Sequence, residues 1–330
     1  MHPLLDPVAG RQHGVFSSRD LRRAGFSHRE VRTLVTRGTW IRLRRGAFVT
    51  AGDLTAAEAK GRRHLLDATA VLLTLDRPSA ALSAYSAAVI SGLPVSRTMP
   101  DDVTLTDPTQ HRTGPGYEVT CAPLPAGDVT MLQGLRGTSL ARTVLDCART
   151  WPLEEALVVA DAARWEDRLP EAQLQAAMTA MGGWRGAEAA RRVVGLAREG
   201  AQSPHETRTR LRLVAAGIPE PRLQVTLRVD GQIAEVDGWW DDVAVAMECD
   251  GRVKYREPWG GRTTEEAHWW EKRRAEIYTA AGVRFWRVAD ADLERGWARA
   301  LARLQAMRAH LLPGPRRFTV SYERRRRRAG

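Results

Sequence analysis

The order of apolar segments between residues 203 and 311 constrains the fold more than any other feature of this sequence. The stretch SPHETRTRLRLVAAGIP predicts a helix, because Ser203 suits its N-cap and Pro204 its first position. RLQVTLRV, QIAEVD and VAVAMECD predict three strands, and Asp230-Gly231 forms a hairpin turn between the first two. A helix, a fourth strand (VRFWRV) and a closing helix follow. The order αβββαβα predicts an α/β sandwich with a mixed sheet.

Acidic residues stand at the ends of two of these predicted strands. Asp237 ends the second strand, and Glu248 and Asp250 end the third. Residues two apart share a face of a strand and antiparallel neighbours lie about 5 Å apart, so we expect the three carboxylates to converge. Unpaired, they would repel one another, and Mg²⁺ or Mn²⁺ would relieve that repulsion. Such a metal can activate water and stabilise a phosphodiester transition state.

A plainer interpretation of the same acids stays open. Carboxylates also flank turns as caps and solubilising groups, and Asp250 followed by glycine is ordinary turn chemistry. The geometry of the strand ends therefore has to decide whether they form a metal site.

Residues 13–50 predict two helices followed by a β-ribbon. Ser27 and Glu30 form a capping box at the start of SHREVRTLVTRG, and TWIRLRRGAFVT alternates like a strand pair that turns at Arg45-Gly46. This is the outline of a winged helix-turn-helix, in which the second helix enters the major groove and the wing contacts the DNA backbone. A small helical domain with a solvated basic face is the alternative.

The charge of the chain favours a polyanionic partner. Its 330 residues carry a net charge of +11, and only Lys60, Lys254 and Lys272 are lysines among 50 basic residues. Nucleic acid is the commonest such partner, although a generically basic surface would give the same number. The residues that we predict to contact DNA are His28, Arg29 and Arg32 on the second helix, Arg42, Arg44 and Arg45 in the wing, and Arg252, Arg256 and Arg273 near the C-terminal acids.

Composition sets further limits. Apolar residues make up 43% of the chain, which is enough for globular cores. No run of eighteen apolar residues predicts a membrane span, and no basic, then apolar, N-terminal segment predicts a secretory signal. The three cysteines lack CxxC spacing, which indicates a reducing compartment and no zinc site. We therefore expect a cytoplasmic protein without a membrane partner.

The predicted fold is a multidomain α+β and α/β chain. Residues 1–52 form the winged helix-turn-helix, and 53–200 a mainly helical middle domain with a small sheet that includes VTLT and YEVTCAPL. Residues 201–312 form the αβββαβα domain. The segment 313–330 is a basic tail, predicted to be disordered, that adds non-specific affinity for phosphate.

The N-terminal half resembles a known family. GVFSSRDLRRAGFSHREVRTLVTRGTWIRLRRGAFVT is similar to the winged-helix domain of AbiEi-type antitoxins of type IV toxin–antitoxin systems. ALSAYSAAVISGLP, GTSLARTVLDCART and EEALVVADAARW are similar to the middle region of the same proteins. The resemblance implies a DNA-binding antitoxin or repressor, with a cognate toxin as a partner.

The C-terminal third resembles a second family. SPHETRTRL, LQV, EVDGWW, MECDGRVKY, EKRRAEIYTAAG and VRFWRV occur in this order over residues 203–293 and resemble the Vsr-like branch of the PD-(D/E)XK, restriction-endonuclease-like superfamily. This resemblance implies metal-dependent cleavage of phosphodiester bonds. It also implies that Asp237 and Glu248 bind the metal and that Glu206 supplies a further acid.

The chain departs from that family's pattern at one catalytic position. The usual motif is Glu-x-Lys, and here Asp250 stands where the lysine should be. Lys254, which is slightly favoured, or Lys272 on the following helix would have to polarise the attacking water. Glu206 also fits a capping box as its N3 residue. If no lysine serves, the domain binds without cutting.

Three functional hypotheses remain. The first is a DNA endonuclease that uses Mg²⁺ or Mn²⁺, with Asp237, Glu248, Asp250, a lysine and Glu206 as its site. The second is a non-enzymatic AbiEi-like antitoxin or repressor whose nuclease-like domain is degenerate. The third is an RNA-acting nuclease or an interaction scaffold. The sequence leaves the target site, the strand preference and the oligomeric state open.

Overall fold

The computed structural model describes residues 4–250, 273–310 and 316–322 of the chain. The chain divides into two compact units. The first unit contains Met1–Val159 and Glu171–Gly195, and the second contains Ala160–Pro170 and Leu196–Gly330. The division falls within helix α8 (Leu153–Arg164).

The N-terminal elements form a winged helix, as expected. They are α1 (Asp6–Arg11), β1 (Phe16–Ser17), α2 (Ser18–Arg23), α3 (His28–Thr36), β2 (Trp40–Arg44) and β3 (Ala47–Thr50), with the strands in the order β1-β3-β2. Capping boxes open both α2, with Ser17 and Asp20, and α3, with Ser27 and Glu30. Because a capping box satisfies backbone N–H groups that a helix start leaves without partners, these two boxes fix where the helices begin.

The core of the winged helix is aromatic. Phe16, Trp40 and Phe48 are buried together, and the Phe16 and Trp40 ring centres lie 4.9 Å apart. One side of α3 packs on this cluster, which leaves the side with His28 and Arg32 exposed. The amphipathic pattern of α3 therefore presents its basic residues to solvent.

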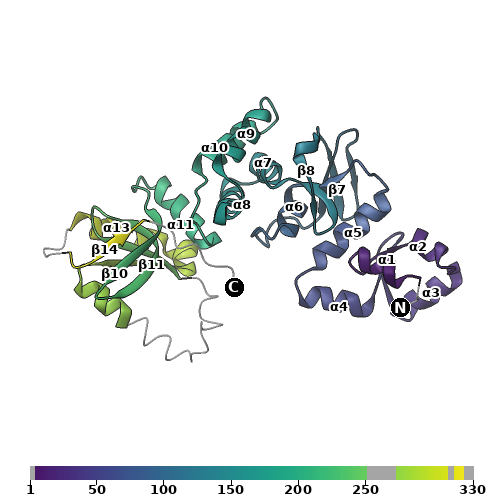
Figure 1. Cartoon of the computed structure of the whole chain (residues 1–330), viewed down its shortest axis with the longest axis horizontal. Helices are drawn as coiled ribbons and strands as arrows, with labels where there is room; N and C mark the ends of the chain where they lie inside the picture. The colour runs from purple at the N-terminus through teal and green to yellow at the C-terminus, as the bar shows by residue number, and fades with distance from the viewer. Residues whose placement is uncertain (1–3, 251–272, 311–315, 323–330) are drawn as a thin grey trace. The chain divides into compact units, whose positions relative to one another are not determined.

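Helix α5 (Arg63–Leu75) belongs to two cores at once and lies between the winged helix and the strands that follow (Figure 1). Leu66 and Ala70 pack with residues of the winged-helix sheet such as Val49. Leu65 and Val71 pack instead among the residues of the next sheet. Because the same rigid helix carries both contacts, it fixes the winged helix against that sheet within the first unit.

The rest of the first unit is a six-stranded mixed sheet with helices. The strand order is β6-β7-β5-β4-β9-β8, with parallel pairs β5–β7 and β4–β9. The strands are β4 (Ala81–Leu82), β5 (Val103–Asp107), β6 (Arg112–Gly114), β7 (Tyr117–Cys121), β8 (Val129–Leu132) and β9 (Leu135–Thr138). The helices are α4 (Ala51–Ala59), α6 (Ala84–Ile90), α7 (Leu140–Thr150), α9 (Glu171–Ala180) and α10 (Ala187–Leu196). The sequence predicted two of these strands, β5 and β7.

The second unit contains a five-stranded mixed sheet in the order β13-β12-β11-β10-β14. Strands β10, β11 and β12 form an antiparallel meander, and β13 is parallel to β12. Residues 319–321 lie in the segment that the sequence predicts to be disordered, and they instead form β14 at the edge of the sheet. The elements are α11 (Pro204–Ala215), β10 (Arg222–Val229), β11 (Gln232–Trp240), β12 (Val245–Asp250), β13 (Arg284–Ala289), α13 (Trp297–Ala309) and β14 (Thr319–Ser321).

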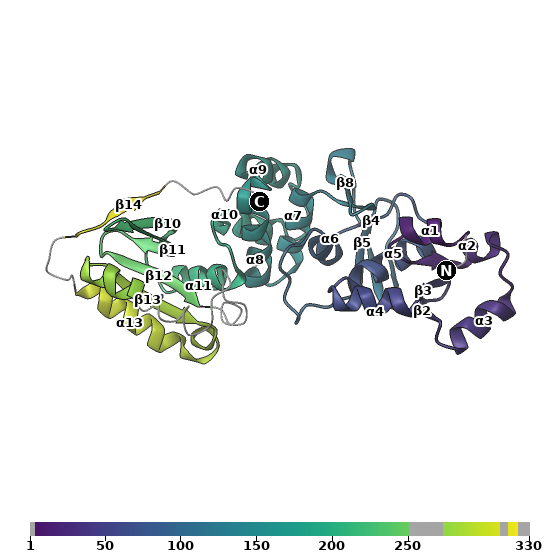
Figure 2. The same cartoon turned by 60° about the horizontal axis from the view of Figure 1, so that its bottom comes forward.

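Both faces of this sheet are covered. Helices α11 and α13 lie beside this sheet (Figure 2). Met247, Cys249 and Trp286 pack with residues of these two helices, and Trp286 Nε1 donates to the carbonyl of Ala300 in α13. On the other face, residues of β10 and β11 pack against Tyr278, which belongs to the helical residues 273–280. Alternate residues of β12 point to opposite faces, so Glu248 lies on the side opposite to Cys249. No helix in the described ranges is long and apolar enough to cross a membrane.

Candidate functional site

A basic groove with a volume of about 1240 Å³ lies on the first unit. Its walls come from α1, α2, α3 and the wing, and also from the end of α5 and the β8–β9 hairpin. Of the residues predicted to contact DNA, it contains His28, Arg32, Arg42 and Arg45. Its cationic side chains are Arg11, Arg19, Arg22, Arg23, Arg32, Arg42, Arg45, Arg77 and Arg136.

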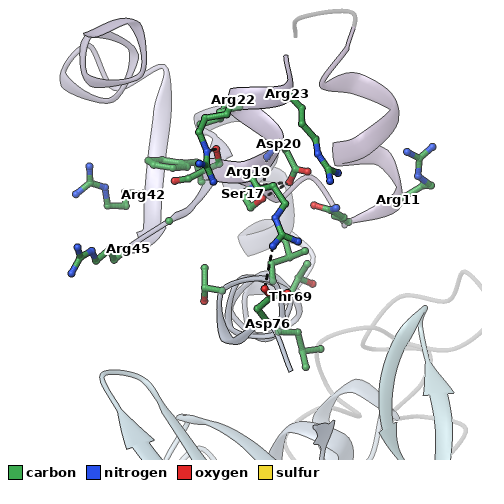
Figure 3. A pocket seen from close by; sticks show the side chains of 18 of the residues that line it. Arg11, Ser17, Arg19, Asp20, Arg22, Arg23, Arg42, Arg45, Thr69 and Asp76 are labelled. Atoms are coloured by element: carbon green, nitrogen blue, oxygen red, sulfur yellow. Dashed lines mark hydrogen bonds and ion pairs between the residues drawn. The ribbon is translucent and has the colours of Figure 1, made fainter. Parts of the chain in front are cut away.

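The arginines of α3 and the wing that line the groove have no acidic partner among the described residues. Arg32, Arg42 and Arg45 are exposed, and none of them has an ion pair within the described part of the chain. Arg42 and Arg45 project from the wing on the same side (Figure 3). The guanidinium carbon of Arg42 lies 5.6 Å from the centre of the Phe48 ring, which holds the stem of the side chain against the sheet. These cations are available to an external anion.

Both acidic residues that line the groove accept hydrogen bonds from other groups of the protein. Asp20 Oδ2 accepts from the backbone N–H of Ser17 at 2.8 Å, within the cap of α2. Asp76 accepts from Arg19 Nη2 at 3.2 Å, across the groove from α2 to the end of α5 (Figure 3). The remaining charge of the groove is therefore strongly positive, which favours a polyanion such as DNA.

Two of the winged-helix residues predicted to contact DNA lie outside the groove. Arg29 is exposed on α3 but does not line the groove. The guanidinium carbon of Arg44 lies 4.6 Å from the centre of the Tyr117 ring on β7, so Arg44 packs against the six-stranded sheet. Tyr117 is remote in sequence from the wing, so no local pattern could have revealed this contact.

Sequence reasoning also missed several groove residues. Arg19, Arg22 and Arg23 belong to α2, and the basic run SSRDLRRAG predicts a helix without indicating that these arginines line a groove. Arg77 and Arg136 come from the end of α5 and from β9, and no sequence motif connects them with the winged helix.

The second candidate site is the acidic cluster of the second unit, formed by Asp237, Glu248 and Asp250. Asp237 on β11 accepts a hydrogen bond from the backbone N–H of Cys249 on β12 at 2.6 Å. Asp250 and Asp237 both raise the pKa of Glu248, in addition to the larger effect of burial. The charges of both aspartates therefore act on Glu248.

Glu248 is nevertheless neutralised by arginines. It is only 6% exposed, and its Oε1 accepts from Arg274 Nη2 at 2.8 Å while its Oε2 accepts from Arg287 Nε at 3.1 Å. Burial raises the pKa of Glu248, and the two arginines oppose that rise without cancelling it. Both oxygens of Glu248 thus accept from guanidinium groups.

Glu206 has the geometry of a helix cap. It is buried as the N3 residue of α11, where Ser203 Oγ accepts from its backbone N–H at 3.2 Å. Ser203 Oγ donates to Glu206 Oε1 at 2.8 Å, while the backbone N–H of Gln202 and Gln224 Nε2 donate to Oε2 at 2.8 Å and 3.0 Å. Both carboxylate oxygens are therefore occupied by local bonds.

In this arrangement the residues do not fit the expected Mg²⁺ or Mn²⁺. Among the described residues, no group of three or more histidine, cysteine or acidic side chains could hold a metal ion. Four predicted site residues, Lys254, Lys272, Arg252 and Arg256, lie outside the described residues. Arg273 is described and exposed.

Three known proteins are similar to parts of this chain. Two proteins of Mycobacterium tuberculosis, named "Uncharacterized protein MT2308" (strain CDC 1551 / Oshkosh) and "Uncharacterized protein Rv2248" (strain ATCC 25618 / H37Rv), are each 31% identical to the chain over 120 residues. The match covers 36% of this chain and 44% of theirs, so the chain spans less than half the length of these relatives. The crystal structure of the RV2827C protein from Mycobacterium tuberculosis matches with a TM-score of 0.39 and 13% identity, over 62% of this chain and 80% of that one.

The match to a family model concerns the domain that carries most of the basic groove. Residues 3–51 match the family described as "Transcriptional regulator, AbiEi antitoxin". These residues contain α1, α2, α3 and the wing. The N-terminal domain of this chain is therefore similar to the AbiEi antitoxin family of transcriptional regulators.

Proposed function

We propose that this protein is a DNA-binding transcriptional regulator of the AbiEi antitoxin kind, and that the basic groove is its DNA-binding surface. One observation carries the proposal: the exposed side of α3 and the wing present arginines that have no acidic partner in the described residues. Because an arginine without an acidic partner keeps its full charge for a phosphate, free arginines beside a recognition helix favour nucleic acid.

The roles within the groove follow from winged-helix geometry. Helix α3 enters the major groove, where Arg32 can contact base edges and His28 stands at its N-terminal end. Arg42 and Arg45 of the wing contact phosphates and set the orientation of the domain. Each neutralised phosphate releases counterions, so affinity falls as salt concentration rises.

The test is binding to duplexes that span the region upstream of the protein's own gene. Full-length protein and fluorescein-labelled duplexes are titrated by anisotropy against a scrambled duplex of equal length. We expect preference for the upstream duplex, and about tenfold weaker binding for Arg32→Ala, as for a lost base contact. Arg191→Ala, an exposed position on α10 outside the groove, is the matched control. Equal affinity of Arg32→Ala and the parent protein would contradict the proposal.

An AbiEi-type antitoxin also implies a toxin. We propose that a neighbouring gene encodes it and that the two proteins are functionally coupled. Induction of the neighbouring gene alone should arrest growth, and co-expression of this protein should restore it. Unaltered growth under induction of either neighbour would remove this part of the proposal and leave the DNA-binding part standing.

A second candidate function is metal-dependent hydrolysis of DNA by the second unit. The observation in its favour is that Asp237 and Asp250 lie close enough to Glu248 to raise its pKa. Against it, Arg274 and Arg287 hold both oxygens of Glu248. Plasmid nicking in Mg²⁺ or Mn²⁺ tests the idea. If the parent protein never nicks DNA, or if Asp237→Ala and Glu248→Ala cut as well as the parent, cleavage is not its function.

A further inference from the structure

The basic groove does not end with the winged helix. Its wall continues along the last turn of α5 to Arg77 and includes Gly134, Leu135 and Arg136 of the β8–β9 hairpin. We infer that the six-stranded sheet supplies a second DNA-contacting surface, in which Arg136 and Arg77 hold phosphates of the same duplex that α3 reads. This inference rests on the proposed function and extends it to residues beyond the winged-helix domain.

The first support is the rigidity of the connection. Helix α5 buries Leu66 and Ala70 against the winged-helix core and Leu65 and Val71 against the sheet. The wall formed by the sheet therefore keeps a fixed position relative to α3. A preformed surface binds an extended, stiff ligand such as duplex DNA without the entropic cost of ordering a linker.

The second support is the way the hairpin presents Arg136. The turn uses left-handed backbone at Gln133 (φ 47°) and Gly134 (φ 83°). Gln133 Nε2 donates to the carbonyl oxygen of Ile90 at 2.9 Å, which attaches the turn to α6. Arg136 is exposed and, in the part of the chain that the structure describes, has neither a hydrogen bond nor an ion pair from its side chain. The β8–β9 turn, which Gln133 fixes to α6, thus places the guanidinium group of Arg136, unpaired among the described residues, in the groove.

The third support is that hydrogen bonds hold the Arg77 side chain in a fixed orientation. Its Nη2 donates to Oδ1 of the fully buried Asp107 at 3.1 Å and to Thr109 Oγ1 at 2.6 Å. Burial alone would raise the pKa of Asp107, but hydrogen bonds from Ser79, Thr109 and Arg77 lower it well below its usual range. The carboxylate stays ionised and orients the guanidinium, whose own side chain remains 36% exposed.

The Arg19–Asp76 ion pair links the two walls of the groove, and a DNA phosphate can take the place of Asp76 in it. Both side chains are largely exposed, at 59% and 70%, so the ion pair contributes little to stability. A DNA phosphate can replace the Asp76 carboxylate as the partner of Arg19 at little cost, because both form charge-assisted hydrogen bonds with a guanidinium group.

The experiment uses full-length protein and the upstream duplex, titrated by anisotropy at a series of NaCl concentrations. For Arg136→Ala we expect about fivefold weaker binding at low salt, and a log–log salt slope smaller by about 1, as for the loss of one phosphate contact. Arg191→Ala removes the same charge outside the groove and should leave both quantities unchanged. Arg77 is not substituted, because its loss would leave the buried Asp107 without a cation.

A hydroxyl-radical footprint adds a spatial measurement. Arg136→Ala should lose protection at one flank of the site only, while Arg32→Ala weakens protection throughout. Equal unfolding midpoints for Arg136→Ala and the parent exclude misfolding. A parental salt slope and footprint for Arg136→Ala, with Arg32→Ala impaired, would overturn this inference alone. Absence of duplex binding by the parent protein would overturn the proposed function with it.

Discussion

Arginines line the basic groove and also surround the acidic cluster, but their charges are used differently in the two places. In the groove, Arg32, Arg45 and Arg136 have no acidic partner within the described residues. In the second unit, Arg274 and Arg287 both bind the buried Glu248. The number of arginines in the sequence therefore does not show where a ligand binds. Arginines of the groove are available to an external phosphate, whereas Arg274 and Arg287 are neutralised by Glu248.

A second network in the same unit extends this contrast. Asp161 is buried, and its Oδ2 accepts from Arg210 Nη2 at 2.8 Å and from Thr207 Oγ1 at 2.9 Å. Its Oδ1 accepts from the backbone N–H of Arg198 at 2.8 Å. The side chains of Asp161 and Arg210 are each only 1% exposed, so their charges serve the packing of the unit and are not accessible to a ligand.

The largest expected effect is the loss of that buried pair. Asp161→Ala leaves the Arg210 guanidinium buried with one partner fewer, and we expect the free energy of unfolding to fall by about 3 kcal/mol. Urea denaturation followed by circular dichroism measures it. Glu58→Ala is the control: it breaks the half-exposed pair with Arg63 and should cost less than about 1 kcal/mol. If both variants lost the same free energy of unfolding, buried ion pairs would not differ from exposed ones in their contribution to stability.

The next effect is a pH dependence that arises from Glu248. Burial raises its pKa in the folded state above the ordinary value of 4.5, so folding binds the proton more tightly. Its contribution to stability is therefore full below pH 4.5 and is lost as the pH rises through the raised pKa. Glu248→Gln cannot ionise. The stability of the parent relative to this variant should decline as the pH rises, and parallel profiles in urea titrations would show that burial does not raise the pKa of Glu248.

Local signals in the sequence predicted the elements that local chemistry decides. The capping box of Ser27 and Glu30 located the start of α3, and the hairpin at Asp230-Gly231 located the turn between β10 and β11. Period-two alternation predicted the meander that brings Asp237 beside β12. Each of these features depends on residues within a few positions of one another, so each can be predicted from a single sequence.

Contacts between distant segments could not be predicted, because the residues that form them are far apart in the sequence. The partners of Glu248 stand on the helical residues 273–280 and on β13, and neither Arg274 nor Arg287 belongs to a motif that points to an acid. Very short strands such as β4 show too few alternations to be recognised. Arg136 joins the groove only because α5 fixes the sheet beside the winged helix.

A smaller effect is expected for the groove itself. Arg32→Ala and Arg45→Ala remove exposed side chains without ion partners in the described ranges, so each should change the free energy of unfolding by less than about 0.5 kcal/mol. The same preparations should nevertheless lose affinity for the upstream duplex. A groove variant that unfolds as readily as Asp161→Ala would show that its arginine stabilises the fold.

The smallest expected effect concerns divalent metal. A cation could approach Glu248 only by displacing Arg274 and Arg287, each of which forms a charge-assisted hydrogen bond with it. Millimolar MnCl₂ should therefore leave the thermal unfolding midpoint of the parent protein unchanged, since a ligand stabilises a fold only where it binds. Arg274→Ala frees Oε1 of Glu248 beside Asp237 and Asp250 and should make the midpoint responsive to Mn²⁺. A response in the parent that Asp237→Ala abolishes would instead show that a metal competes successfully with the arginines, and would strengthen the case for hydrolysis.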